Sequence, residues 1–142
     1  MTATPPTMRA ITRAVCERLA QAGAAYWPGE DGDYTLTPGG PPVYAKPLQA
    51  TPDTALAVAT YQIDPPIDPG DPVTVARVQV RARAPYDADP LADQALAALH
   101  GAHHQEWGGL RVARCAHLSA LQLGADHAGL DERTDNYELH IN

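Results

Sequence analysis

A chain of 142 residues, 44% of them apolar, is long enough to bury a hydrophobic core and favours one domain over residues 1–142. Its formal net charge of −7 argues against a broad basic surface that wraps nucleic acid, because phosphate binding requires clustered cations. No window approaches the ~18 consecutive apolar residues of a membrane span, and no apolar signal segment opens the chain, so we expect a soluble protein without a membrane partner.

The N-terminal third predicts an amphipathic helix and then short extended pieces. Thr4 or Thr7 can cap the helix, and Gly23 can end it. Its single apolar stripe comprises Met8, Ile11, Val15 and Leu19. Turn residues interrupt the following stretch, where we expect short edge strands at Ala25–Trp27, Tyr34–Leu36 and Val43–Lys46.

Two long strands follow and predict an antiparallel pair. Thr54–Ile63 is apolar on both faces, which is typical of a strand covered on both sides. A turn rich in proline and aspartate leads into Val73–Arg83, where small apolar residues alternate with arginine and glutamine. Either the proline-rich loops or a neighbouring subunit must therefore cover the second face of Thr54–Ile63.

A second helix is predicted directly after these strands. Pro85 ends the strand pattern, and Asp89 followed by Pro90 predicts an N-cap with proline at the first helical position. Gly101 is placed to adopt the left-handed conformation that closes a helix. Four apolar residues recur at helical spacing, namely Leu91, Ala95, Leu96 and Leu99.

The C-terminal part predicts two more strands. Residues 110–123 form an extended run, residues 125–135 are a polar linker, and residues 136–142 form a half-buried closing strand. The predicted fold is α+β, with an antiparallel sheet of four to five strands and two helices packed on one face. Cys16 and Cys115 fit small buried thiols, with a bridge between them as the open alternative.

The sequence contains no catalytic motif, so we expect no enzyme activity and no cofactor. His100, His103 and His104 lie near Glu106 and raise the hypothesis of a zinc site. No HExxH motif is present and no fourth ligand is indicated, which favours a solvated loop. The acidic stretch around Gly32 lacks the ligand spacing of a calcium loop and favours a solvated turn.

Several short motifs, in their order along the chain, resemble the tail terminator proteins of long-tailed bacteriophages, in the branch often labelled phage minor capsid protein. The likeness covers nearly the whole chain. The motifs are Tyr26-Trp27-Pro28, Asp31–Thr35, Pro52-Asp53, Val78–Arg83, Leu99-His100-Gly101 and Arg133–Tyr137.

The resemblance implies a structural virion protein, assembled in the host cytoplasm and located in the tail or neck. Such a protein forms a hexameric ring at the head-proximal end of the tail tube, ends tube polymerisation and joins the tail to the head connector. Its implied partners are further copies of itself, the tail tube protein and a head-closure protein, with DNA passing through the ring without sequence-specific binding. The alternatives are another connector subunit, such as a head-closure or adaptor protein, and a small metal- or ligand-binding domain.

For a ring protein, exposed aromatic and arginine side chains are the candidate interface residues. We expect the interface to draw on Trp27, Tyr34, Tyr44, Arg77, Arg81, Arg83 and Trp107. The period of two places Arg77, Arg81 and Arg83 on one side of their strand, from which they can reach carboxylates of a neighbouring subunit. In the alternative, Arg81 or Arg83 pairs within the subunit with Asp87, Asp89 or Asp93.

Overall fold

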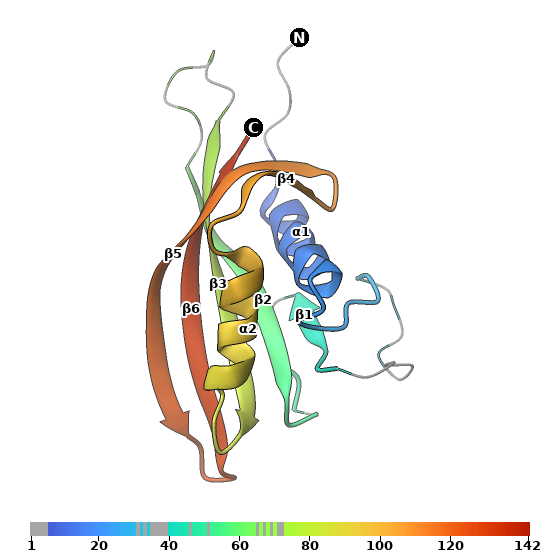
Figure 1. Ribbon diagram of the computed structural model, residues 1–142, viewed down its shortest axis with the longest axis vertical. Helices are drawn as coiled ribbons and strands as arrows, with labels where there is room; N and C mark the ends of the chain where they lie inside the picture. The colour runs from blue at the N-terminus through green and yellow to red at the C-terminus, as the bar shows by residue number, and fades with distance from the viewer. Residues whose placement is uncertain are drawn as a thin grey trace.

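The computed structural model describes residues 6–30, 32, 34, 40–45, 47–50, 52–64, 66, 68, 70 and 73–142. Its elements along the chain are α1 (Met8–Gln21), β1 (Val43–Ala45), β2 (Ala55–Asp64), β3 (Thr74–Pro85), α2 (Asp89–Leu99), β4 (His103–Trp107), β5 (Leu110–Ala125) and β6 (Leu130–Ile141). Figure 1 shows that the strands form one long curved sheet with both helices beside it. The α+β class is thus as predicted.

The sheet is larger than predicted and mixed, which corrects the expectation of four to five antiparallel strands. Its strand order is β1-β2-β3-β6-β5-β4. The strand β1 runs parallel to β2, and every other neighbouring pair is antiparallel. The additional strand is β4, which makes a hairpin with β5 through Gly108 and Gly109, both at positive φ.

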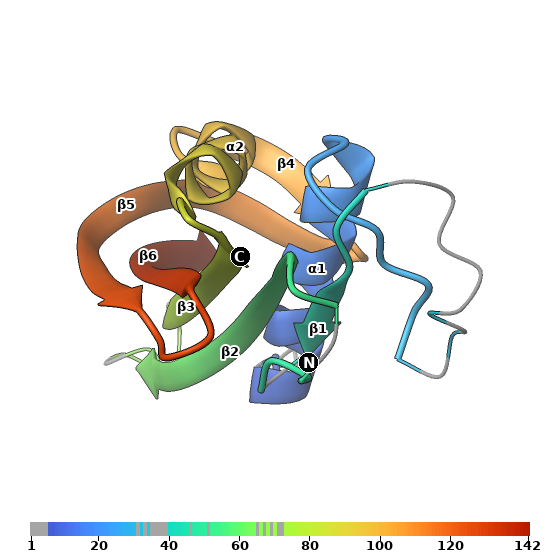
Figure 2. The ribbon, with the colours of Figure 1, turned by 90° about the horizontal axis from the view of Figure 1, so that it is seen from below.

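Both helices lie on one face of the sheet, as predicted. Thr12 of α1 bonds to Thr60 of β2, with 2.8 Å between the two hydroxyl oxygens, and Asp93 of α2 bonds to Arg133 of β6. Thr60 and Arg133 share this inner face with Tyr137, because Thr60 pairs with Val78 and Val78 with Tyr137. Figure 2 shows the curl of the sheet around this side.

The core fills the space between the inner face and the helices. Alternate residues of β3 and β6 are fully buried there, namely Val78, Val80, Ala82, Tyr137, Leu139 and Ile141. Burial of each large apolar side chain contributes about 1.5–3 kcal/mol. The strict alternation explains why the sequence predicts β3 correctly.

The helix ends follow the sequence in three places, one of which is Gly23, at a φ of 76° after α1, and differ in one. The Thr7 hydroxyl accepts the N–H of Ala10 and caps α1, and Gly101 adopts a φ of 81° after α2. The predicted N-cap at Asp89 is wrong, since Ala88 occupies that position and makes no side-chain cap. Instead, the N–H of Ala88 donates to the buried carboxylate of Asp131.

Two other predicted segments also differ, and a third, Tyr34–Leu36, lies mostly outside the described residues. The polar linker at 125–135 is wrong, because β6 already begins at Leu130. Of the predicted strand Ala25–Trp27, only Tyr26 makes an isolated bridge, to Pro42. Tyr34 lies in a 3₁₀ turn, and residues 35–39, together with most of the acidic and proline-rich turns, fall outside the described residues.

Cys16 and Cys115 are free and buried, in agreement with the prediction of buried thiols. Burial raises the pKa of both thiols to about 12, so both stay protonated and unreactive at neutral pH. Within the described ranges, no helix combines the length and apolar character that a membrane span requires.

Candidate functional site

An open groove with a volume of ≈ 1560 Å³ lies along the β1 and β2 edge of the sheet. Its described lining comes from α1, from the segment that precedes β1, from β1 and residues 47–49 after it, and from residues of β2, β3 and β6, all of which except Thr60 face away from the helices. Among the predicted interface residues, it brings together Trp27, Tyr34, Tyr44, Arg81 and Arg83. Residues that are up to 56 positions apart in the sequence therefore form one surface.

The aromatic wall of the groove is held in place from within the subunit. The Tyr34 hydroxyl donates to the carbonyl oxygen of Val43 over 2.7 Å. The rings of Tyr34 and Tyr44 pack with their centroids 4.7 Å apart. Ala57, which pairs with Tyr44, and Ala59 also line the groove, and their small side chains leave room above β2. The groove thus offers an apolar floor with a preformed aromatic side.

Arg83 and Arg81 differ in their burial and in their partners. The Arg83 guanidinium is buried and donates to the carbonyl oxygens of Gln49, Pro52 and Asp53 over 2.7, 2.6 and 3.1 Å. It therefore holds the connection between β1 and β2 against the sheet and covers part of the outer face of β2. Arg81 instead remains 44% exposed at its side chain, while its Nε lies 2.9 Å from a carboxylate oxygen of Glu132.

The two other interface candidates lie away from the groove. Arg77 pairs with Glu138 over 3.3 Å and is partly exposed on the outer face. Trp107 is only 1% exposed, and its indole N–H donates to the side chain of Gln105. Arg77 and Arg81 do pair within the subunit, with carboxylates of β6 rather than with the predicted aspartates near α2.

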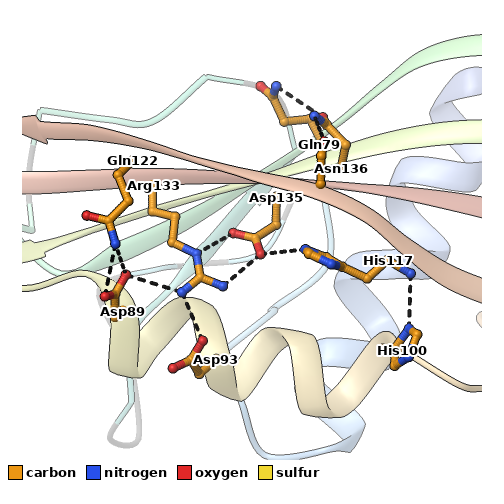
Figure 3. A network of polar contacts seen from close by, with 10 residues as sticks. Gln79, Asp89, Asp93, His100, His117, Gln122, Arg133, Asp135 and Asn136 are labelled. Carbon is orange, nitrogen blue, oxygen red and sulfur yellow. Dashed lines mark hydrogen bonds and ion pairs between the residues drawn. The ribbon is translucent and has the colours of Figure 1, made fainter.

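Two of those aspartates, Asp89 and Asp93, belong to a second polar cluster, on the inner face, that the sequence did not predict (Figure 3). Arg133 donates to both carboxylate oxygens of Asp135 at 2.9 Å. Its remaining amino group contacts Asp93 at 2.9 Å and Asp89 at 3.2 Å. The Asp135 side chain is 2% exposed, so Arg133 neutralises a carboxylate that water does not reach.

Two histidines extend this cluster toward β5. His117 Nε2 lies 2.9 Å from a carboxylate oxygen of Asp135. The backbone N–H of His117 donates to Nδ1 of His100 over 3.0 Å, which requires an unprotonated Nδ1 (Figure 3). The alternation of inward and outward residues along β6 could have predicted this network. Arg133 and Asp135 lie on the same face as the buried Tyr137, so they need polar partners there.

No metal centre emerges from the histidine-rich segment. His103 and His104 are exposed on β4 rather than in the predicted solvated loop, and His100 bonds to backbone. Across the described part of the chain, no group of three or more histidine, cysteine, aspartate or glutamate side chains could hold a metal ion.

Changing His103 and His104 together to alanine should alter the melting temperature by only a few degrees, because neither ring is buried. Differential scanning calorimetry of the metal-free and zinc-treated proteins measures this. A drop of about ten degrees or more would indicate a structural role worth several kcal/mol and would contradict the prediction.

Comparisons with known proteins agree with the fold. The chain matches the sequence model of a family described as bacteriophage tail terminator protein, over residues 20–142. Among solved structures it is similar to a chain of the virion of a native gene transfer agent particle, with a TM-score of 0.53 and 16% sequence identity. That match covers 70% of this chain and 77% of the other. No curated protein gives a significant match.

Proposed function

Because the chain belongs to the bacteriophage tail terminator family, and is therefore a tail-associated structural component of the virion, we propose that it forms a hexameric ring at the head-proximal end of the tail tube. In this position the ring stops tube polymerisation and provides the surface that the head connector binds. The protein acts by contact with neighbouring proteins and catalyses no reaction.

The groove is the observation that carries this proposal. Its aromatic wall, its alanine floor and the partly exposed Arg81 have the composition of a protein interface, in which aromatic residues and arginine are enriched. A head-to-tail contact between identical subunits uses two different surfaces of each subunit and closes into a ring when its rotation divides a full turn. One groove per subunit supplies one of the two surfaces.

Phage particles that lack this protein provide the test. Electron microscopy should show tails of excessive length or tails that have not joined heads, because nothing ends the tube. Native mass spectrometry of wild-type tails should then find a hexamer of this chain at one end. Tails of normal length, together with protein that purifies with the heads, would instead identify a head-closure or adaptor subunit, and one or two copies would exclude the ring.

A further inference from the structure

The far half of β5 has an open edge. β4 pairs with β5 only as far as Arg114, and the backbone of Gly101 and Ala102 bonds to Cys115. From Leu118 to Ala125, β6 is the only strand that pairs with β5 among the described residues. This free stretch exposes three leucines, Leu118, Leu121 and Leu123, to 48%, 60% and 45%. A long open edge with exposed leucines favours pairing with another chain.

This free stretch and the groove lie at the same height along the strands. Leu121 pairs with Thr134, Thr134 with Arg81, and Arg81 with Ala57 of the groove floor. In the strand order, β5 and β2 are separated by β6 and β3, so the two surfaces lie toward opposite sides of the sheet. Two surfaces at one height can be joined between copies by a rotation about an axis along the strands, without a translation. Such a contact closes into a ring rather than a helical filament.

The net charges of the two surfaces are opposite in sign. The described lining of the groove contains three arginines and two carboxylates, of which Arg9 pairs with Glu30 and Arg81 with Glu132, so it carries one net positive charge. Beside the free stretch lie the partly exposed carboxylates of Asp89 and Asp93, with Asp89 bound to the amide of Gln122. Asp126 follows in the turn to β6, where backbone N–H groups of Leu130 and Ala128 lower the pKa of its carboxyl and keep it ionised.

We propose that residues 118–125 of one subunit dock on the groove of the next subunit, with the leucines over Ala57 and Ala59. This inference rests on the proposed ring and names its subunit interface. A second copy of the chain is the favoured occupant, because every copy carries both surfaces and their net charge and height match. A tail tube protein would use only one of the two surfaces and would leave the other exposed.

Disulfide trapping tests the interface in assembled tails. A variant with both Ala59→Cys and Leu121→Cys should give, on mild oxidation, a ladder of covalent oligomers up to the hexamer on a non-reducing gel. The two positions cannot bridge within one subunit, because three strand spacings, about 14 Å, separate β2 from β5. The native cysteines are buried and do not compete.

Two controls make the result specific. Each single cysteine variant should remain monomeric on the gel, and Ala59→Cys combined with Glu106→Cys should give no ladder. Glu106 lies toward the same side of the sheet as the free stretch but at the opposite end of β5, where it pairs with Arg111. A ladder of equal strength from this control would overturn the proposed contact.

Native mass spectrometry of the same tails separates the two proposals. A hexamer without a ladder would overturn the interface and leave the ring intact, whereas absence of any hexamer would overturn both. As a second variant, Leu121→Asp should leave the circular dichroism spectrum unchanged and reduce incorporation into tails at least tenfold. Normal incorporation of this variant would also contradict the interface.

Discussion

Replacing Arg133 with leucine is expected to lower the free energy of unfolding by about 3–5 kcal/mol, because the change removes one partner of a buried ion pair. The Asp135 carboxylate would lose both of its hydrogen bonds to the guanidinium and would keep only the contact with His117. Asp89 and Asp93 would lose the cation that joins α2 to β6. The melting temperature should fall by about ten degrees or more.

Arg81→Leu is the matched control, because Arg81 is also a strand arginine that pairs with a carboxylate of the sheet. Its ion pair with Glu132 is partly exposed to water, so its loss should cost no more than about 1 kcal/mol. Urea denaturation of both variants as free subunits gives the two values. Equal losses of unfolding free energy in the two variants would show that burial does not increase the contribution of Arg133 to stability.

The sequence predicted β2, β3, β5 and α1 because each carries a regular apolar period or a continuous apolar run. The same rule predicted the second half of β6 but failed for residues 130–135, where inward residues include Asp131, Arg133 and Asp135. A polar residue at an inward position is stable only if the fold supplies a partner, and here the partners belong mainly to α2 and the residue before it. The local pattern can show that these positions face inward, but it does not identify their distant partners, so the segment was predicted as a linker.

The candidate site, like the fold, could be predicted only in part from the sequence. The aromatic and arginine residues of the groove could be picked out as candidates by residue type alone. Their convergence could not, because it depends on the parallel pairing of β1 with β2 and on the hydrogen bonds of Arg83 to loop carbonyl groups. The two tryptophans also differ in burial: Trp107 lies in the core, whereas Trp27 lines the groove. Exposure of a single tryptophan depends on tertiary packing, which no short motif encodes.

Replacing Trp107 with alanine should lower the free energy of unfolding by about 3–5 kcal/mol, because the change removes a large side chain from the core. The side chain is 1% exposed and belongs to the core at the end of β4. The turn that follows Trp107 packs closely against α1. A Cβ atom placed on Gly108 would lie only 3.3 Å from the Cα of Ala14. Little room exists for the surrounding chain to collapse into the space that an alanine would leave.

Trp107→Phe is the control for this prediction, because it keeps an aromatic ring in the core and should cost clearly less than the alanine variant. Urea denaturation followed by circular dichroism compares the two. In the Trp27→Phe background, Trp107 is the single remaining tryptophan, and its emission should be blue-shifted in the free subunit and unchanged on assembly. If Trp107→Ala instead unfolds like the wild type but fails to join tails, Trp107 contacts a partner and the assignment to the core is wrong.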